Sequence, residues 1–137
     1  MFHMKTSLSF GSDLEEISSV EKFIDSLCTD YSISEEVYGN ILIATIEAVK
    51  NAIVFGNNND REKPVAVSAY TADDCLVISV KDGGNGFDYE NLPDPTLPEN
   101  IEKISGRGVF LIKNLADKTE FLDNGSRIKM TFKLIKK

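Results

Sequence analysis

Glu47 and Asn51 are the polar residues best placed to do chemistry, because both fall within residues 41–55, a stretch that is otherwise largely apolar. Side chains four residues apart lie on the same face of a helix, one turn apart. An unpaired buried carboxylate is costly, so a polar group should lie against that face. Two explanations remain open. The pair faces a ligand, or Glu47 forms a structural ion pair with Lys50 while Asn51 bonds a neighbouring loop.

A second group of candidate residues follows an apolar run that ends at Val80. It reads Lys-Asp-Gly-Gly-Asn-Gly over residues 81–86, with Asp82 followed by glycines at 84 and 86. An aspartate carboxylate only accepts hydrogen bonds, which suits an exocyclic amine such as that of adenine. Glycines allow close approach of the backbone to a ligand. The alternative is an ordinary turn, since Asp-Gly and Asn-Gly pairs are common in hairpins.

The third group, Ser-Gly-Arg-Gly at residues 105–108, is predicted to open a helix. Glycines at a helix N-terminus expose N–H groups that can bind a phosphate. Residues 83–105, which contain three prolines, have no periodic apolar pattern, and a loop of that length usually forms a lid or binding loop. We expect residues 88–105 to be mobile without nucleotide and to become ordered when it binds.

The elements that must position these groups follow from apolar periodicity and capping residues. Strands are expected at residues 6–10, 65–69, 76–80, 119–122 and 128–135. Helices are expected at residues 13–30, from Ser34 to about 55, and from 109 to 116. Strands joined mostly by hairpins, with helices between them, predict an α/β (α+β) two-layer sandwich: a mixed, mostly antiparallel sheet with helices on one face.

Length and composition limit the function classes. The 137 residues predict a single domain over residues 1–137. The net charge of −7 argues against direct binding of nucleic acid, and the lack of an eighteen-residue apolar run argues against a membrane span. The chain has two cysteines and one histidine, His3, too few for a disulfide scaffold, a zinc cluster or an internal Ser–His pair. We expect a cytoplasmic protein.

The order and spacing of the three groups are more specific than any one of them. Glu-x-x-x-Asn-Ala, then Asp-x-Gly-x-Gly, then Gly-x-Gly opening a helix resembles the Bergerat-type ATP-binding domain of gyrase, histidine kinases and MutL. Within that superfamily the chain is most similar to the anti-sigma factor family of serine-protein kinases. The strings at residues 47–53 and 106–112 carry that likeness, and the resemblance covers residues 5–135.

The resemblance implies roles for individual residues. Asn51 would coordinate the Mg²⁺ that bridges the phosphates of ATP, and Asp82 would accept a hydrogen bond from the adenine amino group. Ser126 stands where the family usually has a threonine near adenine, so a hydroxyl is kept. Glu47 would act as general base toward the serine hydroxyl of a protein substrate.

The glycines of the second and third groups have implied roles as well. Gly84 and Gly86 would let the backbone pass close to the base. The phosphate-binding end of the lid would consist of Ser105, Gly106, Arg107 and Gly108. The chain departs from the family at Phe55, where many members have histidine. It departs again at Ile104, where a basic residue often helps to hold the γ-phosphate; Lys103 and Arg107 are close enough in sequence to replace it.

The resemblance implies an ATP-dependent serine/threonine-protein kinase that phosphorylates a STAS-domain antagonist and sequesters a sigma factor or similar regulator, with ATP and Mg²⁺ as cofactors. A homodimer is the default assembly. Two alternatives stay open: a non-catalytic switch that holds ATP or ADP while it exchanges partners, and a stand-alone ATPase domain of histidine-kinase type. The latter would act on a separate phosphotransfer protein.

Overall fold

The computed structural model describes residues 5–84 and 104–134, and within this range the side chains of residues 104–106 are not described. Five strands form one sheet in the order β1-β2-β3-β5-β4. Their bounds are β1 Lys5–Gly11, β2 Pro64–Ala72, β3 Cys75–Lys81, β4 Lys118–Leu122 and β5 Arg127–Lys133. Every pairing between these strands is antiparallel.

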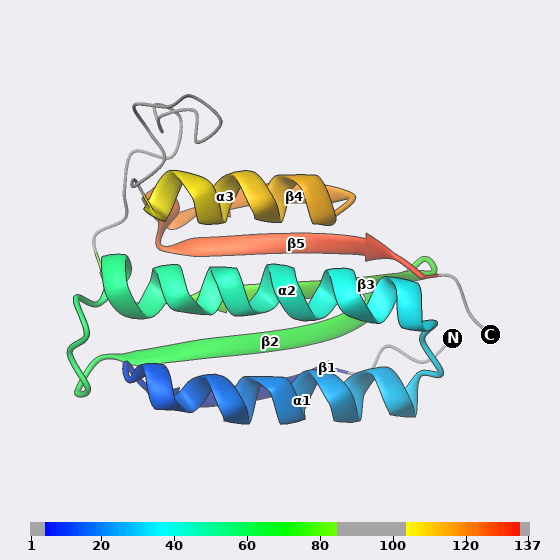
Figure 1. Ribbon diagram of the computed structural model, residues 1–137, viewed down its shortest axis with the longest axis horizontal. Helices are drawn as coiled ribbons and strands as arrows, with labels where there is room; N and C mark the ends of the chain where they lie inside the picture. Colours follow the sequence, from blue (N-terminus) through cyan, green and yellow to red (C-terminus); the bar gives the residue numbers. More distant parts are fainter. Residues whose placement is uncertain (1–4, 85–103, 135–137) are drawn as a thin grey trace.

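Three helices cover one face of this sheet (Figure 1). They are α1 Ile17–Asp30, α2 Glu35–Asn51 and α3 Ile104–Leu115. Short helical turns at Leu14–Glu16 and Asp123–Gly125 complete the elements, together with a π-helical turn at Ala52–Gly56 that extends α2. The predicted two-layer sandwich with helices on one face is confirmed, and the described sheet is antiparallel throughout.

The alternation of apolar residues in the central strands explains why one face of the sheet is covered. Val65, Val67 and Ala69 of β2 are completely buried, while the residues between them are exposed or half-buried. In β3 the register places Ile78 opposite Ala69 and Val80 opposite Val67, so these side chains share that face. The two layers therefore enclose one continuous apolar core.

Local signals set the ends of several elements as the sequence predicts. The Ser34 hydroxyl accepts a hydrogen bond from the Val37 N–H at the start of α2. The turn between β2 and β3 consists of Asp73 and Asp74, with φ values of 51° and 62°. Positive φ at both central residues is the geometry of a two-residue hairpin whose twist matches that of its strands.

Helix α2 is the central helix of the covering layer, and its apolar character follows from that place. Ile41, Ala44 and Val49 are fully buried against neighbouring elements. With the π turn it spans Glu35–Gly56, 22 residues that include an 18-residue stretch with a mean hydropathy of 1.3, which is long and apolar enough to cross a membrane by length and composition alone. The buried core helix of a soluble protein meets the same criterion, so this is weak support for a membrane span.

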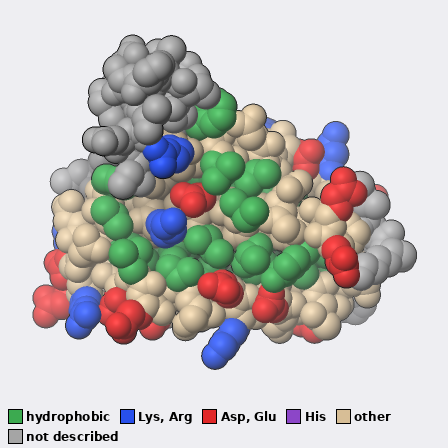
Figure 2. Space-filling view, viewed as in Figure 1, with side chains coloured by type: hydrophobic (Ala, Val, Ile, Leu, Met, Phe, Trp, Pro, Cys, Tyr) green, Lys and Arg blue, Asp and Glu red, His purple; other side chains and the backbone are tan. Residues whose placement is uncertain are grey.

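Large apolar side chains also reach the surface of the helical layer. Figure 2, viewed from the helical side, shows apolar side chains gathered there between charged ones. Ile43 of α2 is 46% exposed and Phe110 of α3 is 44% exposed. Apolar atoms make up a large part of the surface of folded proteins, so these side chains carry no functional argument by themselves.

The start of α3 differs from the sequence expectation. The helix was expected to begin after the glycines at residues 106 and 108, but it begins at Ile104 and includes both. Glycine is a poor helix former, so a contact made by the folded chain should compensate for it. The segment expected to form a nucleotide-gated loop, residues 88–105, lies outside the described residues except for its last two positions.

Candidate functional site

A cavity of about 320 Å³ lies between α2 with its π turn, α3 and the strands β3 and β5. Its wall is mostly apolar, and its polar side chains come from Asn51, Asp82 and Ser126. The remaining lining residues are Ala48, Ala52, Phe55, Gly56, Val80, Val109, Ile112, Phe121, Gly125 and Ile128. A concave apolar site with a few convergent polar groups is typical of a pocket for a small organic ligand.

Asp82 lies immediately beyond the end of β3, which carries its carboxylate into the cavity wall. Its N–H donates to the Ser126 carbonyl at 2.9 Å, and its Oδ1 accepts from the Gly84 N–H at 2.8 Å. Burial raises the pKa of Asp82 above its usual value, and the Gly84 hydrogen bond and the charge of Lys81 oppose that rise. The carboxylate is thus a partly desolvated acceptor.

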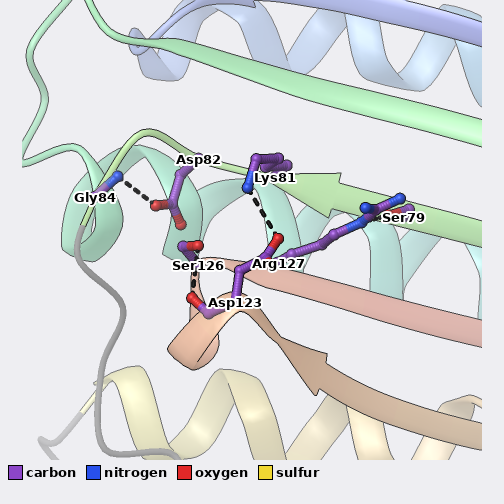
Figure 3. A network of polar contacts seen from close by, with 7 residues as sticks. All are labelled: Ser79, Lys81, Asp82, Gly84, Asp123, Ser126 and Arg127. Atoms are coloured by element: carbon purple, nitrogen blue, oxygen red, sulfur yellow. Dashed lines mark hydrogen bonds and ion pairs between the residues drawn. The ribbon is translucent and has the colours of Figure 1, made fainter.

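The neighbours of Asp82 hold the end of the cavity in place. Figure 3 shows Asp82 beside Ser126, with Lys81 directed toward Asp123. Lys81 and Asp123 form an ion pair at 3.0 Å, and the Ser126 hydroxyl donates to the Asp123 carbonyl at 2.9 Å. The structure therefore brings Ser126 next to Asp82, and its role near adenine stays a prediction.

Two glycines let the π turn approach the Asp82 loop closely. A Cβ atom at Gly56 would lie 2.2 Å from Asp82 Oδ2, and a Cβ at Gly84 would lie 2.2 Å from the Gly56 carbonyl oxygen. Neither distance is possible between non-bonded atoms, so the two backbones pack together only because both residues lack side chains. A π turn of this kind often marks a functional site in a helix.

Gly84→Ala is expected to lower the free energy of unfolding by about 1–3 kcal/mol, because its methyl group would overlap a backbone oxygen that cannot rotate away. Urea unfolding of both proteins measures this loss. Gly39→Ala is the matched control, since a Cβ at Gly39 meets nothing within 4 Å and alanine favours a helix. Equal stability of the two variants would contradict the close packing of these backbones.

The first and third sequence groups meet where α2 and α3 pack together. A Cβ at Gly108 would lie 2.9 Å from Asn51 Nδ2 and 3.3 Å from Glu47 Oε2. The helix α3 therefore begins directly over the pair on α2, and this contact explains a glycine within its first turns. Among the described residues, Asn51 makes no side-chain hydrogen bond, so its amide is available to a ligand.

Glu47 has a partner of its own on α2. Its Oε1 lies 3.4 Å from Lys50 Nζ, and its side chain is 22% exposed while that of Lys50 is 46% exposed. The structural ion pair considered from the sequence therefore exists. A contact this long and exposed contributes little to stability, and it leaves Oε2 beside Gly108 free of Lys50.

The other predicted site residues are placed as follows. Ser105 and Gly106 lie in the first turn of α3, where N–H groups have no partner within the helix. Arg107 is exposed in the same turn. Gly86 lies outside the described residues, so its predicted contact with the base stays a prediction.

The most conspicuous residue that sequence reasoning missed is Asn57. Asparagines tolerate the left-handed conformations that often end a helix, and Asn58 and Asn59 do have positive φ. Asn57 does not; its φ is −104° and its side chain is fully buried. The sequence shows three consecutive asparagines and offers no signal that the first is buried.

An Mg²⁺–nucleotide fits the donors of this cavity. In the described part of the chain, no group of three or more His, Cys, Asp or Glu side chains could hold a metal by itself. Mg²⁺ in nucleotide sites is held largely by phosphates and water with one or two protein oxygens, a demand that Asn51 can meet. The Asp82 carboxylate offers an acceptor in the lining of the same cavity.

Comparison with known sequences places this site in a family. The profile of the histidine kinase-like ATPase domain matches residues 10–132. The serine-protein kinase RsbW of Listeria innocua is 26% identical over 136 residues, covering 94% of this chain and 87% of the relative. The anti-sigma F factor of Clostridium perfringens is 34% identical over 123 residues, covering 85% of this chain and 84% of the relative.

Comparison with solved structures agrees on the fold. The crystal structure of the RsbU and RsbW domains of Rv1364c from Mycobacterium tuberculosis matches with a TM-score of 0.70 at 16% identity. The match covers 96% of this chain but only 32% of that longer chain. By sequence and by fold, the chain belongs to the histidine kinase-like ATPase domain family, in the group that contains anti-sigma factors and serine-protein kinases.

Proposed function

We propose that this protein is an ATP-dependent serine/threonine-protein kinase of the anti-sigma factor type. The observation that carries the proposal is a cavity lined by both the Asp82 acceptor and Asn51, with Asn51 and Glu47 lying against Gly108 of α3. Such a reaction requires groups that bind adenine, groups that bind the phosphates, and a base close to the phosphates.

The nucleotide would be held by groups from four elements. Asp82 would accept from the adenine amino group, and the Ser126 hydroxyl would bond near the base. Asn51 would bind Mg²⁺, and N–H groups of the first turn of α3, at Ser105 and Gly106, would face the phosphates. When bound, Mg²⁺ neutralises charge that develops on the transferred phosphoryl group.

Glu47 would take the proton from the attacking serine hydroxyl of the protein substrate. Its carboxylate is partly exposed, so a hydroxyl group from a second protein can approach it. It lies one helical turn before Asn51, so it would lie close to a metal and phosphates held there. Geometry of this kind is the first requirement for a general base.

The partners follow from the names of the relatives, which are a serine-protein kinase and anti-sigma F factors. We infer a STAS-domain antagonist as phosphoryl acceptor and a sigma factor or similar regulator as the sequestered protein, with the chain acting in the cytoplasm. A homodimer is the proposed assembly. Nucleic acid and membranes are not proposed as direct partners, because the net charge of −7 disfavours both.

A second candidate is a switch that binds ATP or ADP and exchanges partners without phosphoryl transfer. Two features favour it. The Glu47–Lys50 ion pair engages the proposed base, and Ile104 stands where the family resemblance implies a basic residue. Both candidates require nucleotide binding. Only the kinase requires transfer.

The test is transfer of labelled γ-phosphate from ATP to a cognate STAS protein, together with titration calorimetry of ATP in the presence of Mg²⁺. The kinase predicts binding and an acid-stable phosphoserine product, and Asn51→Ala should weaken both binding and transfer. Binding without transfer to any cognate STAS protein would favour the switch. An acid-labile phosphohistidine on a partner would favour the histidine-kinase type, and no binding would overturn all three.

A further inference from the structure

Asn57 links the segment that follows Asp82 to residues next to strands β1 and β2. It is 0% exposed, and its Oδ1 accepts from the Gly83 N–H at 2.7 Å. Its Nδ2 donates to Ser12 Oγ at 2.8 Å and to the carbonyl of Pro64 at 3.1 Å, with the carbonyl of Lys63 at 3.3 Å. The side chain thus bonds the segments that follow β1 and β3 and the segment that enters β2.

The orientation of this amide is fixed by its partners. If the oxygen and nitrogen exchanged places, the NH₂ group would face the Gly83 N–H and the oxygen would face backbone carbonyls. The two ends of the amide therefore bind different parts of the chain. The oxygen binds Gly83, the residue that follows Asp82, and the nitrogen binds Ser12 and Pro64.

These bonds fix Asp82 from both sides. On one side its own N–H donates to the Ser126 carbonyl at 2.9 Å, and on the other side Gly83 is held by Asn57. Gly83 itself is exposed and has no side chain to anchor it. Without the Asn57 oxygen, the backbone after Asp82 would be free to move, and the carboxylate would move with it.

We propose that Asn57 is a positioning residue that aims the Asp82 carboxylate and thereby sets the preference of the site for adenine over guanine. The inference rests on the proposed function. A fixed carboxylate accepts from the amino group of adenine, whereas guanine presents a carbonyl oxygen at that position and is repelled. A site built around such a bond discriminates strongly only while the acceptor stays in place.

The experiment compares ATP and GTP binding, with Mg²⁺, to wild type, Asn57→Ala and Ser12→Ala. Asn57→Ala should raise the ATP dissociation constant about tenfold and reduce the ATP-over-GTP preference by a similar factor. Ser12→Ala is the matched control, because it removes buried hydrogen bonds to Asn57 and to the Lys63 carbonyl and leaves the Gly83 bond intact. It should lower the melting temperature yet keep the ATP preference within about twofold.

Asn57→Asp keeps an acceptor oxygen for the Gly83 N–H and loses the N–H donors to Ser12 and to the carbonyl of Pro64. It should unfold at a lower temperature than wild type and still prefer ATP. If Asn57→Ala does not fold, the ATP and GTP affinities of Asn57→Asp are compared with those of wild type instead. An unchanged ATP preference in Asn57→Ala would overturn the inference. So would an equal loss in Ser12→Ala, or loss of the preference in folded Asn57→Asp. If wild type binds ATP and Asp82→Asn binds it more weakly, any of these results refutes only the role of Asn57. If wild type does not bind ATP, the proposed function itself is refuted.

Discussion

Replacing Glu47 by glutamine is expected to slow phosphoryl transfer to a partner serine by about 10²- to 10⁴-fold and to leave ATP affinity within a few-fold. Glutamine keeps nearly the same volume and helix position, so the cavity should be preserved. It cannot accept the proton of the attacking hydroxyl. Single-turnover transfer of labelled γ-phosphate, with ATP affinity measured separately by calorimetry, checks both parts of the expectation.

Lys50→Gln is the matched control for Glu47→Gln. It breaks the same 3.4 Å ion pair but leaves the Glu47 carboxylate in place. If Glu47 is the base, Lys50→Gln should keep transfer within a few-fold of wild type. If the pair matters only for structure, both variants should lose a little stability and neither should lose transfer, because the contact is partly exposed.

Asp82→Asn is expected to weaken ATP binding by about 10- to 100-fold, because a charged acceptor becomes an amide whose donor faces the adenine amino group. The amide oxygen can still accept from the Gly84 N–H, which the wild-type Oδ1 does at 2.8 Å. The loop should therefore keep its conformation. Calorimetry with ATP and Mg²⁺ measures the loss, and unchanged affinity would contradict adenine recognition by Asp82.

The same variant is expected to be more stable than wild type without nucleotide at neutral pH. Burial raises the pKa of Asp82 in the folded protein, so ionisation of this group opposes folding above that pKa. Its favourable contribution is fully present below the unfolded pKa and is lost as pH rises through the folded value. The advantage of Asp82→Asn in urea unfolding should therefore shrink as pH is lowered toward 4. An advantage that grows on acidification would contradict this account.

The predictions for Glu47→Gln transfer and for Asp82→Asn binding separate the two steps of the reaction, nucleotide binding and phosphoryl transfer. Asp82→Asn should weaken nucleotide binding, while Glu47→Gln should slow transfer and leave the ATP affinity nearly unchanged. A protein in which both residues serve only the fold would show neither pattern, because losses of stability would lower both activities together.

Much of the local structure could be predicted because its causes are local. The cap at Ser34 is set by hydrogen bonds within a few residues of the chain. The Asp73-Asp74 turn needs only residues that tolerate positive φ. Alternation in β2 shows which side chains are buried, and the apolar run of α2 marks the central helix. The order of three polar groups along these elements was enough to indicate the family.

The sequence by itself therefore determined the elements, the fold class and the chemical types of the site residues. Only the tertiary structure decided that Gly108 lies on Asn51, that Gly56 packs beneath Asp82, and that Asn57 is buried against Gly83. The periodicity of apolar residues indicates that one face of an element is buried, but not which distant segment packs against that face. Contacts between α2, α3 and the end of β3 join residues about 25 to 60 positions apart, and long-range packing of the whole chain fixes them.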